Sequence, residues 1–247
     1  MPISGSRRFV KRRADAPPGF FATEAAGLAW LGEGPLRVPR VFDVADDAIV
    51  MERIEPGARS AAFDAELGCG LAQLHALGAE RWGAQRTFLG PLEVPNGAAP
   101  DWPSFYGAQR LEPLLRTAVD ADALPHGAAL RIERVIARLP GLCGPAEPPA
   151  RLHGDLWSGN VMTGPDGSPW LIDPGAYGGH REVDLAMLSL FGGPGPDFLP
   201  AYEEVSPLAE GHADRVALYQ LLPLLVHAVL FGGGYGAAAD RAARAYC

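Results

Sequence analysis

The sequence contains little lysine and little cysteine. Lys11 is the single lysine among 21 basic residues, so this position suggests a need for a compact point charge in place of the planar guanidinium of arginine. The three cysteines, Cys69, Cys143 and Cys247, are scattered along the chain without metal-binding spacing. This usage predicts a reducing, cytoplasmic compartment.

Long apolar runs and a secretory signal are also missing. The most apolar stretch, Leu221 to Phe231, is shorter than a membrane span and contains His227, so we expect a core helix there. The start, Met1 to Ser4, lacks the apolar region of a signal peptide. A net charge of -8 argues against a nucleic-acid surface. We therefore expect neither a membrane nor a nucleic-acid partner, while the oligomeric state stays open.

The most informative segment runs from Arg151 to Asp173. It places Asn160 five residues after Asp155, and its short apolar runs predict a hairpin of strands 160–163 and 169–172 that ends on Asp173. An Asp, four residues, an Asn, a strand pair and a second Asp form the spacing of kinase-type phosphoryl-transfer enzymes. The alternative is an ordinary hairpin with Asp and Asn in its turns.

The residue types fit that chemistry. A hydroxyl nucleophile needs a carboxylate base that no metal consumes, which is the role predicted for Asp155. Hard Mg²⁺ prefers oxygen ligands and must leave positions for phosphates, so Asn160 and Asp173 are its predicted ligands beside the phosphates of ATP.

A second pair lies near the start of the chain. Phe9 to Lys11 forms a strand-like run, and residues 19–31 read as a helix with Glu24 near its beginning. In kinase-like folds a strand lysine holds the nucleotide phosphates and is itself held by a glutamate of the next helix. Lys11 and Glu24 fit these roles, although a solvated lysine and a first-turn glutamate would look the same.

Two further strands, 39–44 and 48–54, are predicted before a polar connection at Glu55. Backbone groups of Glu52 and Ile54 could pair with an adenine edge there, or the segment could be a plain strand end. Apolar spacing then predicts a series of helices and a breaker-rich link from Pro140 to Pro149. The helices are expected at 63–78, 107–119, 128–139, 182–191, 198–204 and 214–231.

Residues 153–161 read HGDLWSGNV, and residues 172–186 read IDPGAYGGHREVDLA. This pattern of residues resembles the fructosamine kinase family, a branch of the aminoglycoside phosphotransferase and protein-kinase-like superfamily. The resemblance runs from about Gly5 to the end of the chain. It implies an α+β, protein-kinase-like fold of two lobes, with a truncated N-terminal sheet lobe at 1–55 and a mainly helical C-terminal lobe at 56–247.

The resemblance also implies a function. Such an enzyme would use ATP and Mg²⁺ to phosphorylate the third hydroxyl of a ketosamine, a fructosamine or ribulosamine on a small amine or a protein lysine. The phosphorylated adduct would then break down, which amounts to deglycation. Trp157 would pack on the sugar or be structural, and Asp184 would support the catalytic loop.

One part of the family pattern is missing. A glycine-rich loop should cover the phosphates before the lysine strand, but only Gly5 precedes Lys11, in a turn-like Gly5-Ser6. The sequence thus suggests an internal start or an open phosphate site with weak ATP binding. Two alternatives to the ketosamine kinase follow. One is a kinase of aminoglycosides, choline or other hydroxylated amines, and the other is a catalytically weak nucleotide-binding protein.

Overall fold

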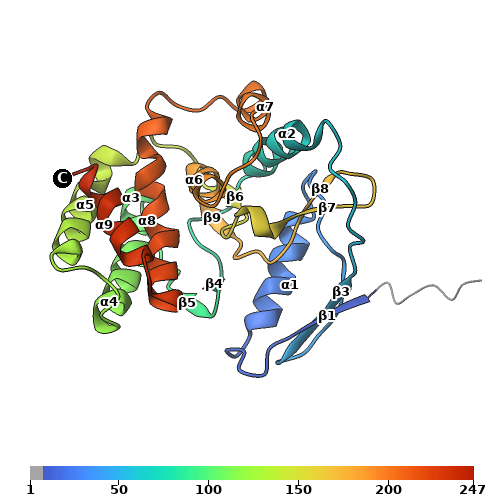
Figure 1. Ribbon diagram of the computed structural model, residues 1–247, viewed down its shortest axis with the longest axis horizontal. Coiled ribbons are helices and arrows are strands. Elements are labelled where there is room, and N and C mark those ends of the chain that lie inside the picture. Colours follow the sequence, from blue (N-terminus) through green and yellow to red (C-terminus); the bar gives the residue numbers. More distant parts are fainter. Residues whose placement is uncertain (1–7) are drawn as a thin grey trace, which may run out of the picture.

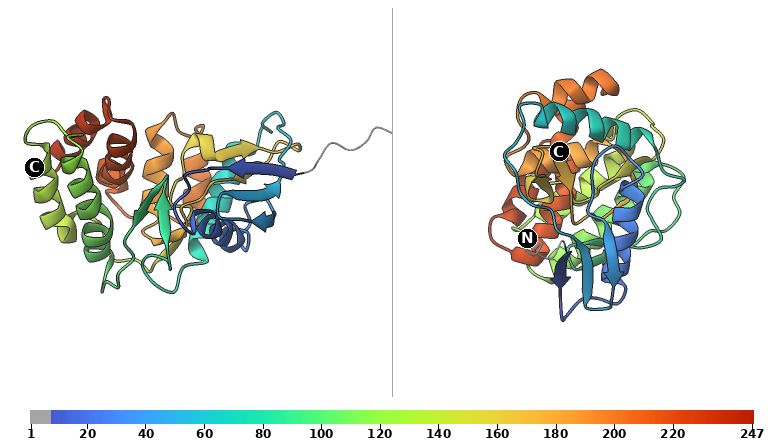
Figure 2. Two further views of the ribbon diagram at one scale, coloured as in Figure 1. Left: turned by 90° about the horizontal axis from the view of Figure 1, so that it is seen from below. Right: turned by 90° about the vertical axis from the view of Figure 1, so that its right-hand side faces the viewer.

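The computed structural model describes residues 8–247, and the turn predicted at Gly5-Ser6 lies outside them. Figures 1 and 2 show a sheet with helix α1 at one end and the helices α4, α5, α8 and α9 at the other, with α6, β6 and β9 between them. The predicted α+β, protein-kinase-like architecture of a small sheet part and a mainly helical part is confirmed. The exact lobe boundary at residue 55 stays a prediction.

The sheet has the order β1-β3-β2, with all pairs antiparallel. Its strands are β1 (Arg8–Arg12), β2 (Val41–Val44) and β3 (Ala48–Glu52). In β1, Lys11 pairs with Ile49 and Phe9 with Met51. Because alternate residues of a strand share a face, Lys11 points to the same side as these two buried side chains.

Helix α1 (Phe20–Leu31) covers that side of the sheet. Its buried positions Phe21, Glu24, Leu28 and Leu31 recur every three or four residues, which places them on one face. Phe21 and Leu28 pack with Ile49 and Met51 of β3 in one apolar cluster. The burial of Glu24 among these residues is therefore an exception that requires a partner.

The chain leaves β3 and crosses to the hairpin of β7 (Val161–Thr163) and β8 (Pro169–Leu171), which is the predicted catalytic hairpin. The N–H of Gly57 donates to the carbonyl of Thr163, and that of Ser60 to Gly167. Helix α2 (Phe63–Ala76) then packs closely against α7 (Phe198–Val205). A Cβ at position 68 would lie 2.2 Å from the Phe198 carbonyl oxygen, so only glycine fits there.

A further short hairpin, a pair of strands distant in sequence and a single helical turn complete the middle of the molecule. Strand β4 (Thr87–Leu89) pairs with β5 (Leu92–Val94), and β6 (Ala150–Leu152) pairs with β9 (Tyr177–Gly179). The turn η2 (Ser158–Asn160) directly precedes β7, so Asn160 is held at the entrance of the catalytic hairpin.

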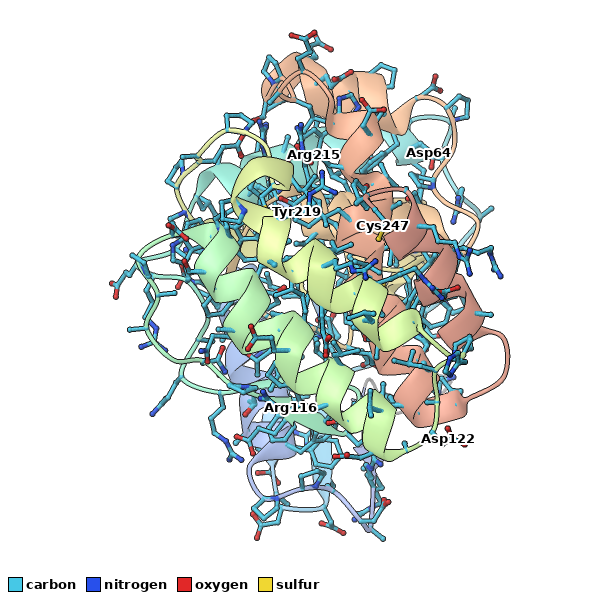
Figure 3. The ribbon with its side chains drawn as sticks, turned by 90° about the vertical axis from the view of Figure 1, so that its left-hand side faces the viewer. Asp64, Arg116, Asp122, Arg215, Tyr219 and Cys247 are labelled. Atoms are coloured by element: carbon cyan, nitrogen blue, oxygen red, sulfur yellow. The ribbon has the colours of Figure 1, made fainter. Side chains whose placement is uncertain are left out.

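The helical end encloses the largest apolar core, and Figure 3 looks onto it with α4 and α5 in front. The buried guanidinium of Arg215 on α8 donates to Glu182 on α6 at 2.6 and 2.8 Å, which ties these two helices together. The helices are α3 (Trp102–Tyr106), the π-helical turn η1 (Gly107–Leu111), α4 (Glu112–Asp120), α5 (Ala128–Leu142), α6 (Glu182–Leu190), α8 (His212–Phe231) and α9 (Tyr235–Arg244).

Two details differ from the sequence-based expectations. Helix α5 continues through Pro140 to Leu142, because a proline in the last turn removes a single intrahelical bond. The residues after α8 form a further helix, α9, which packs on α8 and α5. The predicted core helix within α8 is confirmed: α8 is long and apolar enough to span a membrane by composition, but 56% of its most apolar window is buried.

Candidate active site

The loop that carries Asp155 begins directly after β6 and depends on a glycine. Gly154 has a φ of 81°, and a Cβ there would lie 2.2 Å from the carbonyl oxygen of Gly175. A side chain at this position would be both strained and in collision with the backbone. The sequence His-Gly-Asp therefore brings the loop into contact with the segment that follows β8.

The side chain of Asp184 supports this loop by accepting hydrogen bonds from its backbone. Its carboxylate is fully buried and accepts the N–H of His153 at 2.7 Å and the N–H of Gly154 at 2.9 Å. His75 of α2 lies 3.2 Å from the same carboxylate through Nε2, while its Nδ1 lies 2.8 Å from the Tyr202 hydroxyl. These contacts confirm the expected supporting role of Asp184 and leave His75 with a structural role.

Asn160 lies beside Asp155, as its spacing predicts. Its Nδ2 donates to the backbone oxygen of Asp155 at 2.8 Å and to its Oδ2 at 3.2 Å. His153, which the sequence reading did not single out, places Nε2 at 2.9 Å from the Ile172 carbonyl. The two ends of the hairpin are thereby held together, and Asp155 and Asp173 lie at the same end.

Lys11 joins the sheet to the catalytic hairpin. Its ammonium lies 3.1 and 3.0 Å from the two carboxylate oxygens of Glu24 and 3.0 Å from Oδ1 of Asp173. Asp173 has a φ of 53°, a left-handed conformation that is strained for residues other than glycine. The strained backbone presents its carboxylate to the lysine, so the predicted Lys11–Glu24 pair forms and includes Asp173 as well.

Burial and charge shift the ionisation of these groups. Burial raises the pKa of the Asp155 carboxyl, and the nearby His153 and His227 rings oppose that effect. Burial likewise raises the pKa of Glu24, with Lys11 acting against it. For Lys11, burial lowers the pKa, but the carboxylates of Glu24 and Asp173 outweigh it, so the pKa of the ammonium is raised. Lys11 is consequently a permanent cation in the site.

These side chains line a cavity of about 110 Å³. Its walls include Lys11, Glu24, Asp155 and Asp173, together with backbone and side chains of Phe20, Thr23, Phe88, Gly90, Pro174 and Gly175. A cation and three carboxyl groups thus meet in one small space. A larger groove of about 1430 Å³, which α1 also borders, is lined by none of the predicted site residues.

The donor atoms suit a hard metal ion. Among residues 8–247 no three His, Cys, Asp or Glu side chains cluster with metal-binding geometry, so a carboxylate cage is absent from this part of the chain. The amide nitrogen of Asn160 donates to Asp155, and its Oδ1 accepts no hydrogen bond from the described part of the chain. One amide oxygen and the carboxylate of Asp173 match Mg²⁺, which also takes phosphate oxygens and water.

The two residues predicted to meet an adenine differ in their availability. The N–H of Glu52 already donates to the Arg40 carbonyl at 2.7 Å inside the sheet. The N–H and C=O of Ile54, in contrast, have no hydrogen-bond partner among the residues described. Of this pair, only Ile54 thus has a backbone N–H that no described residue occupies.

Trp157 lies two residues beyond Asp155 and is 39% exposed. Its ring meets that of Phe191 edge-on, with 6.0 Å between centroids. Phe191 in turn contacts His227, which also contacts Phe231 and Tyr235. We call these five residues the aromatic cluster. Of its members, sequence reasoning singled out only Trp157 as a candidate site residue, since the five residues come from four separate segments of the chain.

Comparisons with known proteins show what the whole chain is similar to. The model of the fructosamine kinase family matches residues 3–246. A probable ketoamine kinase from Thermus thermophilus is 39% identical over 237 residues, covering 96% of this chain and 86% of that protein.

Solved structures give the same result. The crystal structure of a candidate fructosamine-3-kinase from Thermobifida fusca superposes with a TM-score of 0.90 at 45% identity, covering 96% of this chain and 84% of the other. A choline kinase from Streptococcus pneumoniae superposes with a TM-score of 0.64 at 17% identity, covering 96% and 85%. This second likeness concerns the fold alone.

Proposed function

The chain belongs to the fructosamine kinase family, and from this we propose that it transfers the γ-phosphoryl group of ATP to the third hydroxyl of a ketosamine. The acceptor is a fructosamine or ribulosamine on a small amine or a protein lysine. The resulting phosphate ester destabilises the adduct, so its sugar is released and the amine is deglycated. The observation that carries this proposal is the meeting of Lys11, Asp155 and Asp173 around one cavity.

Asp155 acts as the general base. The acceptor oxygen attacks the γ-phosphorus while the bond from that phosphorus to the β,γ-bridging oxygen breaks, and ADP leaves. The proton of the hydroxyl passes to the carboxylate of Asp155, whose raised pKa makes it a better proton acceptor than an ordinary aspartate. Asn160 orients this carboxylate through its Nδ2.

Lys11 and Glu24 position the nucleotide phosphates. The ammonium supplies the positive charge, and the buried Glu24 carboxylate holds it in place from α1. Asn160 and Asp173 would hold Mg²⁺, which neutralises phosphate charge when bound. Ile54 would pair with the adenine edge through its backbone, with Glu52 behind it in the sheet.

The other readings have less support. The likeness to a choline kinase shows the fold alone at 17% identity and gives no ground for a different acceptor. The complete set of Lys11, Asp155 and Asp173 favours catalysis over a nucleotide-binding scaffold. A reducing, cytoplasmic setting is part of the proposal, supported by Cys69, Cys143 and Cys247 all being free thiols.

Phosphate transfer assayed with a fructosyl-amine and with an aminoglycoside tests this proposal. We expect ATP-dependent phosphorylation of the fructosyl-amine at its third hydroxyl. Transfer to the aminoglycoside with none to the fructosyl-amine would overturn the proposed acceptor, and transfer to neither would favour the nucleotide-binding alternative.

A further inference from the structure

Arg151 is a charged residue in a strand whose other two positions are apolar. Its neighbours in β6, Ala150 and Leu152, both pack in the largest apolar core. Because successive side chains of a strand point to opposite faces, Arg151 points away from this core. It is nevertheless only 8% exposed. A buried guanidinium needs hydrogen-bond partners to offset the loss of its hydration, so the contacts of Arg151 require an explanation.

Two of these contacts lie at the C-terminal end of α1. Nη1 of Arg151 donates to the carbonyl of Trp30 at 2.7 Å and to Oε2 of Glu33 at 2.7 Å. The guanidinium also lies over the Trp30 ring, 4.6 Å from its centroid. The last turn of α1 has no basic residue of its own, so Arg151 supplies the positive charge that the C-terminal end of a helix favours. Arg151 thus joins the end of α1 to β6.

The middle of α1 rests on residues 174–176, which follow the catalytic hairpin. A Cβ at Gly27 would lie 3.2 Å from the Cβ of Ala176 and 3.3 Å from Cγ of Pro174, so the helix approaches this segment closely. Glu24 lies one turn before Gly27 on the same buried face of α1. The position of the Glu24 carboxylate therefore depends on how α1 is held against the helical part.

Strand β6 also leads directly into the catalytic loop. It ends at Leu152, and residues 153–155 follow without a break. Arg151 itself borders the larger groove and does not line the cavity that contains Asp155. One guanidinium thus connects the strand before the proposed base to the helix that carries the partner of Lys11.

We propose that Arg151 is a positioning residue for phosphoryl transfer, which holds α1 against β6 so that Glu24 meets Lys11. This inference rests on the proposed function and adds to it a residue that contacts neither ATP nor the acceptor. Without the guanidinium, the C-terminal end of α1 moves away from β6 and takes Glu24 with it. The ammonium of Lys11 then loses one of its two carboxylate partners.

The first test uses the fact that Lys11 is the single lysine. Labelling with acetic anhydride, followed by peptide mapping, measures how reactive its amine is and requires neither ATP nor an acceptor. Arg151→Met should increase the rate of labelling of Lys11 roughly 2- to 30-fold, because the amine loses Glu24 and becomes more accessible. Glu24→Gln should increase the rate as well.

The double variant shows whether Arg151 acts through Glu24. Adding Arg151→Met to Glu24→Gln should change the rate of labelling by less than about 2-fold, because the contact that Arg151 maintains is already lost. A double variant in which the two increases multiply would overturn the proposal. A rate in Arg151→Met equal to that of the wild-type protein would overturn it as well.

Arg131 provides the matched control. It pairs with the buried Asp240 and so ties α5 to α9, at the opposite end of the molecule from α1 (Figure 1). Arg131→Met should lower the melting temperature but leave the labelling of Lys11 and the KM for ATP unchanged. Equal labelling of Lys11 in Arg131→Met and Arg151→Met would show that any loss of stability exposes this lysine, which contradicts a positioning role.

The second test is kinetic. Arg151→Met should raise the KM for ATP roughly 2- to 30-fold and leave the KM for a fructosyl-amine unchanged, whereas a loss of folded protein would lower kcat alone. Arg151→Lys keeps a positive donor, so its KM for ATP should lie between those of the wild type and Arg151→Met. An unchanged KM for ATP in Arg151→Met would overturn the proposal. A wild-type protein that phosphorylates no ketosamine would instead contradict the proposed function, while the labelling of Lys11 would still test the role of Arg151.

Discussion

The ammonium of Lys11 lies 3.0 Å from the carboxylate of Asp173, so a residue of the sheet and a residue of the catalytic hairpin are in direct contact. Glu24 of α1 holds the same ammonium from the other side. The positions of β1, α1 and the hairpin are thus coupled through a single charged side chain. Any change at Lys11 is expected to affect both the stability of the fold and the binding of ATP.

Lys11→Met should lower the free energy of unfolding by about 1–3 kcal/mol, because it leaves the buried Glu24 carboxylate without its partner. The double variant Lys11→Met/Glu24→Gln should regain part of this loss. Chemical denaturation measures both effects. Arg12→Ala is the control, since its ion pair with Asp47 is mostly exposed and should contribute less than about 1 kcal/mol. Equal losses in Lys11→Met and Arg12→Ala would contradict a structural role for the Lys11–Glu24 pair.

Asp184→Ala should lower both stability and kcat, although Asp184 does not line the cavity. It removes the acceptor of the His153 and Gly154 N–H groups, and each unsatisfied buried donor costs about 1–3 kcal/mol. We expect a lower melting temperature and, in the protein that remains folded, a reduced kcat. Asp120→Ala, at an exposed position on α4, should change stability by less than about 0.5 kcal/mol. A stable Asp184→Ala enzyme with normal kcat would show that the loop needs no such support.

Asp155→Asn should stabilise the protein while it removes activity. Burial raises the pKa of Asp155 above the ordinary value of 3.8, so the ionised carboxylate costs stability at neutral pH. That cost is fully present above the raised pKa and disappears as the pH falls toward 3.8. The gain in melting temperature of Asp155→Asn over wild type should therefore be largest at neutral pH and shrink on acidification. If the gain in melting temperature instead grew on acidification, the pKa of Asp155 would not be raised in the folded protein.

The proposed metal ligands can be tested through binding. Mg²⁺ and ATP together should raise the melting temperature more than ATP alone, because a ligand stabilises the state that binds it. Asp173→Ala and Asn160→Ala should each abolish the Mg²⁺-dependent part of this shift. Asp166→Ala is a suitable control, since Asp166 lies in the turn of the same hairpin and pairs with the exposed Arg37. An Mg²⁺-dependent shift that survives in Asp173→Ala would exclude this residue as a ligand.

Much of the site could be predicted from sequence because its chemistry is local. Asp155, Asn160 and Asp173 belong to one hairpin, so their spacing alone brings them together. The Lys11–Glu24 pair could be inferred from a strand followed by a helix. The positions of His227 and Phe231 could not, because they depend on the packing of α8 against α6 and Phe191, which is a long-range tertiary contact.

The limits of local sequence patterns also explain where the predicted helices differ from the observed ones. Proline usually ends a helix, and so α5 was expected to stop before Pro140, but a proline in a last turn removes one hydrogen bond only. The alanine residues of α9 favour a helix, but three glycines directly precede it and interrupt the helical pattern of α8, so no separate helix was expected there. Its stability comes from packing on α5 and α8.

The most direct test of the central claim is the transfer of labelled γ-phosphate from ATP to a fructosyl-amine in the presence of Mg²⁺, with the product position determined by NMR. Wild-type protein should produce the 3-phosphate, and Asp155→Asn should lose about 10²- to 10⁴-fold in kcat while it still binds ATP. Equal rates in the two proteins would contradict the assignment of Asp155 as the base, and with it this account of the site.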